Sequence, residues 1–266
     1  MSFQHILYVA GDDGIARLTL NDPAHKNAYT VAMCAELLEA IDAFTRADAL
    51  KVLVLTGAGD AFCAGGNLHN AADFAQAHAR VLGHSAQMRE SMHAVNLALH
   101  RLDKPTISMI NGDAVAGGLA LALMCDFRIA SSSARLGDPS GRAGLLPDEG
   151  GAWLFPRVMG LEAALRMSLL GEIYDAATAL RLNLIGEVVT PDRLEARVAE
   201  LAASLAQKAP LVVRAVKKLM RRSLTQTFEQ SLGDAELVLD AVNNSADARE
   251  GVAAFREKRA PRFSGR

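Results

Sequence analysis

Two glycine-rich segments carry the backbone groups of this chain that are best suited to bind negative charge. The first runs from Thr56 to Leu68 and the second from Asn111 to Gly118, and each follows an apolar run. Glycine permits backbone conformations that turn amides outward. Amides at the start of a helix lack intrahelical partners and lie at the positive end of its dipole. Tight turns or close packing would explain either segment alone, whereas their joint occurrence favours a site built from backbone donors.

Three short apolar runs predict buried strands around these segments: Ile15–Leu20, Lys51–Thr56 and Thr106–Ile110. Apolar residues recur at helical spacing after Thr30, which is suited to be an N-cap. The apolar stretch Leu119–Cys125, directly after the second glycine-rich segment, predicts a buried core helix. Strands separated by helices favour crossover connections and an α/β fold with helices covering the sheet.

The chain changes character at about Glu149. Beyond it the pattern is almost wholly helical, with interruptions at Gly160, Gly171, Ile185–Val189, Pro191 and Pro210. We therefore expect residues 1–195 to form an α/β core that holds the binding site. Residues 196–266 are expected to form a helical C-terminal region.

Composition limits the classes of protein that this chain can belong to. Half of the 266 residues are hydrophobic and 22% are charged, which excludes a disordered or collagen-like chain. The net charge of -2 gives no general attraction to nucleic acid. The longest apolar stretch, Ala114–Cys125, is shorter than the roughly 20 residues of a membrane helix, and Met1–Ala10 is no secretory signal. We expect a cytoplasmic protein.

The cysteine and histidine content predicts neither disulfides nor a metal site. The three cysteines are widely separated in apolar surroundings, which predicts reduced, buried thiols at Cys34, Cys63 and Cys125. Histidines, cysteines and carboxylates do not occur at metal-ligand spacing, so we expect no metal.

The C-terminal region contains two basic clusters. We interpret the first as a solvated helix face; it comprises Arg214, Lys217, Lys218, Arg221 and Arg222. The second spans residues 249–266 and combines six basic with two acidic residues and two phenylalanines. Such a combination suits RNA or the phosphates and adenine of a nucleotide-like cofactor, and composition alone does not distinguish them.

Four segments occur in an order and spacing that is typical of one family. They are Asn21–Ala28, Phe62–Asn67, Ile110–Asp126 and Phe255–Arg266. On these segments the chain resembles the enoyl-CoA hydratase/isomerase family, also called the crotonase family, over nearly its whole length. One difference is Asn67, because the first oxyanion loop of that family usually ends in aspartate.

The resemblance implies a fold, an assembly and a substrate. The fold is a spiral of ββα units, and the C-terminal helical region packs trimers that are often paired into hexamers. The substrate is an acyl-CoA, so coenzyme A is part of the substrate and no cofactor is tightly bound. By motif position, the amides of Gly66 and Gly117 would form an oxyanion hole for the thioester oxygen.

The resemblance also assigns the residues that contact coenzyme A. The backbone around Lys26, Ala28 and Ala64 would hold the adenine and pantetheine parts. Phe255 and Lys258 would reach the nucleotide, a contact that can cross a subunit boundary. This assigns the second basic cluster to cofactor phosphates rather than to nucleic acid, although Lys258 as a plain solvated charge stays an alternative.

The chain departs from the family where its hydratases place two glutamates. By motif position these would fall at Ala120 and Ser140. Neither a methyl group nor an unassisted hydroxyl acts as a carboxylate base at neutral pH. Ordinary hydration by two glutamates is therefore not expected.

A replacement is offered by Asp148 and Glu149. Asp148 falls where double-bond isomerases of the dienoyl-CoA type in this family place a catalytic aspartate. Burial beside an apolar pocket would raise the pKa of either carboxyl group and make it a usable base or acid. The structural alternative is that Asp148 caps a helix beginning there and Glu149 complements its dipole.

Three other polar residues near the expected site have less definite roles. We interpret His69 as a surface histidine in preference to one that faces the acyl group. Asp138 and Arg142 either shape the floor of the pocket or pair with each other.

The expected function is that of an acyl-CoA enzyme working through an enolate-like intermediate, by double-bond isomerisation or an atypical hydration, as in fatty acid metabolism. Thioester hydrolysis, decarboxylation and carbon–carbon cleavage are alternatives on the same fold. Two further alternatives are a catalytically silent acyl-CoA binder and an RNA-binding role of the basic clusters.

Overall fold

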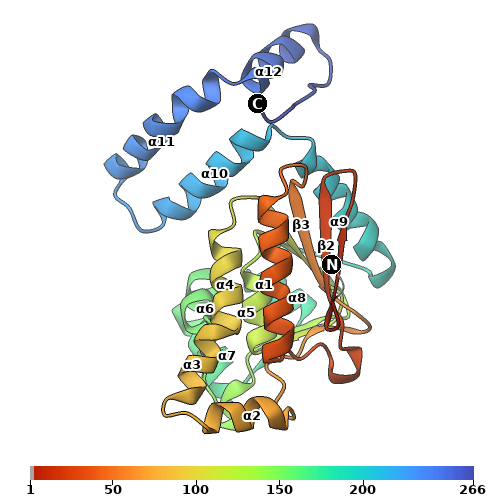
Figure 1. Ribbon diagram of the computed structural model, residues 1–266, viewed down its shortest axis with the longest axis vertical. Coiled ribbons are helices and arrows are strands. Elements are labelled where there is room, and N and C mark those ends of the chain that lie inside the picture. The colour runs from red at the N-terminus through yellow and green to blue at the C-terminus, as the bar shows by residue number, and fades with distance from the viewer. Residues whose placement is uncertain (1–2) are drawn as a thin grey trace.

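Two sheets lie at the centre of the protein, which the computed structural model describes over residues 3–266 (Figure 1). The larger sheet has the order β1 (Ile6–Ala10), β2 (Ile15–Leu20), β3 (Val52–Gly57), β5 (Thr106–Ile110), β7 (Phe127–Ser131) and β10 (Glu187–Val189). The smaller has the order β4 (Ala61–Cys63), β6 (Asp113–Val115), β8 (Arg135–Gly137) and β9 (Ile173–Asp175). The pairs β1–β2 and β8–β9 are antiparallel, and the other pairs are parallel.

Successive turns of the chain each place one strand in each sheet and then a helix. Thus β3 and β4 are followed by α2 (Ala71–His78), α3 (Gly83–Glu90) and α4 (Met92–Arg101). Next, β5 and β6 precede α5 (Gly117–Leu123), whereas β7 and β8 precede η2 (Ser140–Ala143), α6 (Gly151–Met159) and α7 (Leu161–Leu170). This spiral of ββα units is the architecture that the sequence resemblance predicts.

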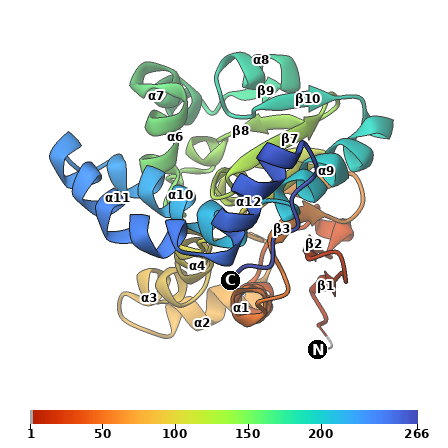
Figure 2. The ribbon, with the colours of Figure 1, turned by 90° about the horizontal axis from the view of Figure 1, so that it is seen from above.

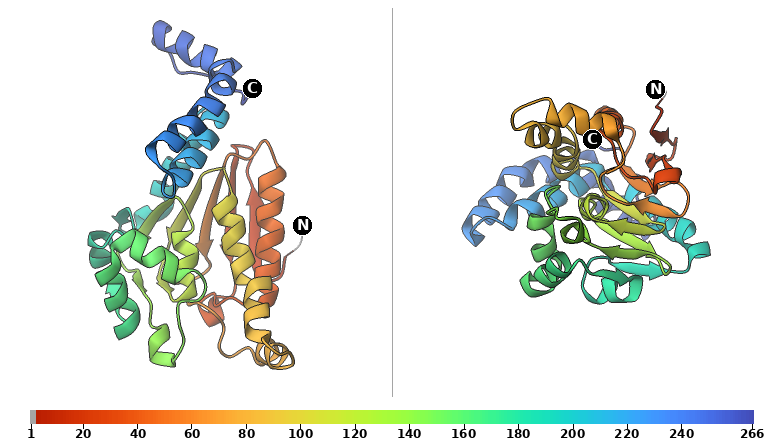
Figure 3. Two further views of the ribbon diagram at one scale, coloured as in Figure 1. Left: turned by 90° about the vertical axis from the view of Figure 1, so that its left-hand side faces the viewer. Right: turned by 90° about the horizontal axis from the view of Figure 1, so that it is seen from below.

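Both faces of the large sheet are buried, which explains why its strands are almost continuously apolar. Val52, Val54 and Ile107 form one core with α9 (Pro191–Ala206). Leu53 and Leu55 point to the opposite face and join the main core, which also includes apolar residues of α1 (Val31–Arg46), α4 and α5. Figure 3 shows the helices on either side of the sheet.

The elements predicted from local pattern agree closely with the structure. Strands β2 and β5 have the predicted bounds, and β3 is displaced by one residue. Thr30 is the N-cap of α1, where its Oγ1 accepts a hydrogen bond of 3.1 Å from the amide of Met33. The helix predicted at Leu119–Cys125 begins and ends two residues earlier. The three cysteines are free and buried.

The prediction of an almost wholly helical second half is wrong at one edge of the small sheet. Strand β9 pairs with β8 there and leads into α8 (Ala176–Arg181). Three residues are too few for an alternating pattern to be recognised in sequence. The strand is therefore defined by its partner rather than by its own composition.

Three helices extend from the body as an arm: α10 (Pro210–Ser223), α11 (Phe228–Asn243) and α12 (Ala246–Glu257) (Figure 2). The chain end folds back onto α12, where the carboxylate of Asp247 accepts hydrogen bonds from the amides of Ser264 (2.6 Å) and Gly265 (2.8 Å). The predicted division after residue 195 falls within α9, which packs on the large sheet.

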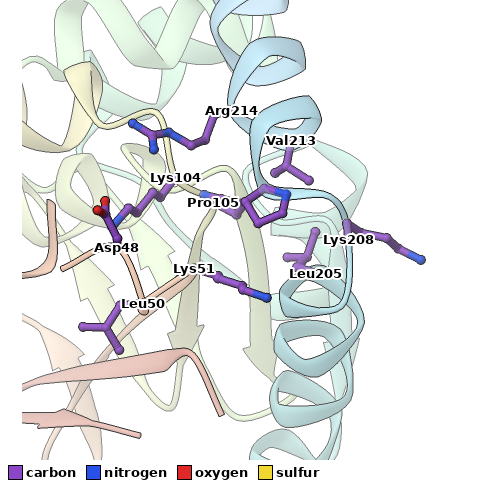
Figure 4. Close-up of a pocket in the computed structure, with 10 residues that line it drawn as sticks. Asp48, Leu50, Lys51, Lys104, Pro105, Leu205, Lys208, Val213 and Arg214 are labelled. Carbon is purple, nitrogen blue, oxygen red and sulfur yellow. The ribbon is translucent and has the colours of Figure 1, made fainter. Parts of the chain in front are cut away.

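The junction of arm and body encloses a cavity of about 30 Å³, room for about one water molecule (Figure 4). Two of the three lysine side chains that line it donate hydrogen bonds to backbone carbonyl groups. Lys51 Nζ donates to the carbonyl of Ala206 at 3.1 Å, and Lys104 Nζ donates to that of Phe44 at 2.9 Å. This cavity is therefore part of the joint between the arm and the body.

In the first basic cluster, Lys217 and Arg221 are partly buried and fasten α10 to the body, so the interpretation of the cluster as a solvated face is wrong for these two residues, whereas Arg214, Lys218 and Arg222 are exposed. Lys217 and Arg221 both pair with Asp126, at 2.6 and 2.7 Å. Two further pairs, at 2.7 and 2.8 Å, are Arg214–Asp103 and Arg222–Asp234. Four of the five basic residues thus have acidic partners within the chain, which weakens the RNA-binding alternative.

Candidate active site

The two glycine-rich loops lie against each other because the strands that lead into them are neighbours. In the small sheet, Cys63 of β4 is paired with Ala114 of β6. Just beyond these strands, a Cβ atom on Gly65 would lie 3.4 Å from the amide nitrogen of Gly117. Gly65 has φ 92°, a conformation that side chains other than glycine rarely adopt.

The amide of Gly66 is left free by the way in which its loop is held. The amide of Tyr29 donates to the carbonyl of Gly65, and the amide of Asn67 donates to the carbonyl of Tyr29, both at 2.9 Å. These two hydrogen bonds form a parallel bridge between Tyr29 and Gly66 that involves the carbonyl of Gly65 and the amide of Asn67 but not the amide of Gly66. No acceptor for that amide is present among residues 3–266.

The amide of Gly117 is free for a different reason. Gly117 is the first residue of α5, and amides in the first turn have no intrahelical acceptor. Ala116, directly before it, has φ 49°, and such strain in a residue other than glycine costs about 1–3 kcal/mol. The structure thus maintains a strained turn that orients an unpaired amide at the positive end of a helix.

A buried carboxylate lies directly beside these amides. Glu149 is 8% exposed, and the hydroxyl of Tyr29 donates a hydrogen bond of 2.6 Å to its Oε1. A Cβ atom on Gly117 would lie 2.7 Å from the Tyr29 hydroxyl and would collide with Glu149 Oε1. Only a glycine at this helix start leaves room for both groups.

The surroundings of Glu149 keep it close to a change of protonation at neutral pH. Burial raises its pKa to about 7, the hydrogen bond from Tyr29 opposes that rise, and the negative charge of Asp148 adds to it. No cation is among the causes of the shift. A carboxyl group in this state can both accept and return a proton.

Helix α4 holds the backbone of the two acidic residues. His93 Nε2 donates to the carbonyl of Asp148 at 2.8 Å, and Asn96 Nδ2 donates to the carbonyl of Glu149 at 2.6 Å. The N-cap of α6 is Gly150, in a left-handed conformation and without a side-chain cap. The alternative in which Asp148 caps this helix is therefore wrong.

A cavity of about 480 Å³ opens in front of the two carboxyl groups. Its lining includes the apolar side chains of Leu97, Met124 and Trp153. The polar side chains of His93 and His100 also line the cavity. The ring of His100 packs edge-on against that of Trp153, with 5.7 Å between the ring centroids. This chamber is large enough for an apolar group of several carbon atoms.

The other residues predicted to bind coenzyme A fall into two groups. Ala64 donates its amide to the carbonyl of Lys26 at 3.0 Å, and Ala28 lies in the same segment, so these three residues line the edge of the first loop. Lys26 is exposed, and its Nζ lies 3.2 Å from Asp113.

Phe255 is 85% exposed on α12, and Lys258 directly follows that helix. Both residues therefore belong to the arm, which extends away from the body that holds the two loops (Figure 1).

The positions of the two absent glutamates are buried. Ala120 is fully enclosed in α5. The amide of Ser140 donates to Asp138 at 3.2 Å, and Asp138 also accepts a hydrogen bond of 2.6 Å from Ser168. Asp138 therefore has partners other than the predicted Arg142. His69 is exposed, in keeping with its interpretation as a surface residue.

Tyr29, His93 and Asn96 are site residues that sequence reasoning missed. Tyr29 directly follows Asn21–Ala28, the first of the four family-like segments. His93, Asn96 and His100 occur at spacings of three and four on α4, which places polar groups on one face of an otherwise apolar helix. This spacing could have identified the polar face of α4 as part of the site.

Comparisons with known proteins agree with the fold. Residues 10–266 match the family model described as Enoyl-CoA hydratase/isomerase. A 1,2-epoxyphenylacetyl-CoA isomerase from Escherichia coli (strain K12) is 35% identical over 255 residues, which cover 96% of this chain and 97% of that protein. A trans-2-decenoyl-[acyl-carrier-protein] isomerase from Streptococcus mutans is 33% identical over all of both chains.

A solved structure, that of an enoyl-CoA hydratase from Bacillus anthracis, superimposes with a TM-score of 0.92 at 28% identity, covering 99% of this chain and 100% of the other. Fold and site together define an enzyme that acts on acyl-CoA thioesters. The chain belongs to the enoyl-CoA hydratase/isomerase, or crotonase, family. Within residues 3–266, no helix combines the length and the apolar character that crossing a membrane requires.

Proposed function

We propose that this protein moves a double bond of an enoyl-CoA through a thioester enolate. The amides of Gly66 and Gly117 would bind the thioester oxygen, where negative charge appears when a proton leaves the acyl carbon. Each well-aimed donor at such an oxygen contributes roughly 3–4 kcal/mol to lowering the barrier. Two unpaired amides in adjoining loops support this assignment.

The observation that carries the proposal is the buried Glu149 carboxyl group beside Gly117. With its pKa raised to about 7 by burial, it is present in both protonation states near neutral pH. Its ionised form would remove a proton from one carbon of the acyl group. Its protonated form would return that proton to another carbon, which moves the double bond without loss of atoms.

Asp148 is the second candidate for proton transfer. It lines the same cavity, next to Glu149 in sequence, and is more exposed. Its negative charge helps to raise the pKa of Glu149. In the proposal, Glu149 is the group that exchanges the proton, and Asp148 biases its protonation.

Hydration of an enoyl-CoA is a second candidate function, favoured by the presence of two carboxyl groups at one cavity. Two carboxylates are the groups that position a water molecule and transfer its proton. Ala120 and Ser140 are not carboxylates, so such a hydration would use Asp148 and Glu149 in an atypical arrangement.

Coenzyme A would bind along the first loop, with its adenine and pantetheine parts at the backbone of Lys26, Ala28 and Ala64. Phe255 and Lys258 would contact the nucleotide of a neighbouring subunit in a trimer or a hexamer. The arm supports this assembly because it exposes large apolar side chains, among them Leu237 (82% exposed) and Phe255.

The proposal is tested by incubating the protein in D₂O with a panel of enoyl- and dienoyl-CoA thioesters. Proton NMR would then show both double-bond movement and exchange of carbon-bound protons. We expect both in the wild type and in Glu162→Gln, a control on the surface of α7. Glu149→Gln should lower the rates of both by about 10³-fold.

Other outcomes identify the alternatives. Hydrated product would indicate hydration, and free coenzyme A would indicate a thioester hydrolase. Loss of CO₂ or of an acyl fragment would indicate a decarboxylase or a carbon–carbon lyase. Binding without turnover or exchange, unchanged by Glu149→Gln and Asp148→Asn, would indicate a silent acyl-CoA binder.

A further inference from the structure

We infer that Tyr29 is a positioning residue of the proposed reaction: its hydroxyl group holds Oε1 of Glu149 beside Gly117 and leaves Oε2 to exchange the proton with the acyl group. The inference rests on the proposed function, because it needs Glu149 to be the proton carrier. Its basis is the hydrogen bond of 2.6 Å that joins the two buried side chains across 120 positions of sequence.

Tyr29 is fixed more firmly than a side chain that is merely packed. Its amide and its carbonyl group both bond to the first glycine-rich loop, through Gly65 and Asn67. The residue is 7% exposed, so its ring has no room to swing towards solvent. One residue therefore links the backbone that presents the Gly66 amide to the orientation of the carboxyl group.

The phenol of Tyr29 stays protonated and acts as a donor. Burial, followed by the charge of Glu149, raises the pKa of Tyr29 well above its usual value. A donated hydrogen bond stabilises an ionised carboxylate more than a neutral carboxyl group. In the reaction, the proton would pass from carbon to Glu149 and the electron pair to the enolate, while Tyr29 keeps its own proton.

The charged and titratable groups around the pair come from several elements. Asp148 precedes Glu149 and raises its pKa. From β4, Cys63 adjoins both residues, and burial raises the pKa of its thiol to about 12, so it stays neutral. From α4, His93 lines the same cavity. Tyr29 is therefore the neutral donor whose loss should act most directly on the Glu149 carboxylate.

The direct test is Tyr29→Phe, which removes the hydroxyl and keeps the ring. Without the donor, the ionised form of Glu149 is less stable and its pKa rises. We expect the pH at which kcat/KM reaches half its maximum to move upward by about one unit. The ¹³C signal of the Glu149 carboxyl group should titrate with the same upward shift.

The chain offers a matched control. The hydroxyl of Tyr174 donates to Oε2 of Glu172 at 2.7 Å, a tyrosine–glutamate pair at the edge of the small sheet and outside the cavity. Tyr174→Phe should leave the pH profile of kcat/KM unchanged. A shift of the same size in that variant would overturn the inference, because it would mean that loss of any such hydroxyl alters the profile.

A second substitution should shift the pH profile in the opposite direction, and it provides the test if Tyr29→Phe does not fold. A fluorinated tyrosine at position 29 is a stronger donor, and it should lower the pKa of Glu149 and move the profile to lower pH. An unchanged profile in a folded position-29 variant, with Glu149→Gln inactive, overturns the role of Tyr29 and leaves the proposed function intact. Full activity of Glu149→Gln overturns the proposed function itself.

Discussion

Two carboxylates of this protein, the partly buried Asp126 and the buried Glu149, have opposite surroundings. Asp126 lies just beyond α5 and accepts Lys217 and Arg221 from α10, as well as the amide of Thr106 at 2.8 Å. Glu149 lies near the other end of α5, with a neutral tyrosine as its side-chain donor. The two cations make Asp126 a structural link between the arm and the body, whereas burial beside a phenol raises the pKa of Glu149 to about 7, so that this carboxyl group can change its protonation state.

The largest expected effect is on activity, from Glu149→Gln. Loss of a positioned general base should lower kcat by about 10³-fold. Stability should not fall, because the amide avoids the cost of burying an ionised group. Steady-state kinetics together with urea unfolding would check both parts. A large loss of stability would show that Glu149, like Asp126, is structural.

Asp126→Asn should show the reverse pattern. It leaves Lys217 and Arg221 without their partly buried anion, and we expect a loss of about 3 kcal/mol in the free energy of unfolding. The proton exchange catalysed at Glu149 should persist in the folded fraction. Denaturant unfolding and the D₂O exchange assay measure the two quantities. Equal damage to exchange would contradict the separation of the two regions.

Gly117→Ala should lower kcat by about 10²-fold. The added methyl group collides with Glu149 Oε1 and meets the Tyr29 hydroxyl, so it displaces the carboxyl group and the adjoining amide together. Gly233→Ala, on the arm and with open space around it, is the matched control. Kinetics of both variants would show whether the space at position 117 matters.

The smallest expected effect is the pH dependence of stability. The pKa of Glu149 is raised to about 7 in the folded protein, whereas in the unfolded chain it is near 4.5. The folded state therefore binds more protons between these values, and its stability falls as pH rises through this window. We expect a loss of about 2 kcal/mol between pH 5 and 8 that is absent in Glu149→Gln. Urea unfolding at several pH values measures it.

The sequence allowed prediction of those features that a local pattern determines. Buried strands, the N-cap Thr30 and the glycine-rich loops are each defined by residues within one short segment. The resemblance to a family added the spiral of ββα units. Asp148 and Glu149 were predicted as the acidic residues of the site, and the structure places both at one cavity.

Contacts between distant segments could not be predicted in this way. Tyr29 and Glu149 are 120 positions apart, and their contact depends on the pairing of β4 with β6 and on the hydrogen bond from Asn96 of α4 to the carbonyl of Glu149. Lys217 reaches Asp126 only through the direction that α10 takes after Pro210. The sequence separation of the residues involved predicts neither of these two contacts.

Helix α5 lies between the arm and the turn that presents the Gly117 amide. Arg221 of the arm bonds to the carbonyl of Met124 and to Asp126 at the C-terminal end of α5, and Gly117 opens the same helix. Seven residues of helix form a stiff rod about 10 Å long. The arm and the strained turn at Ala116 are therefore attached to opposite ends of one short helix.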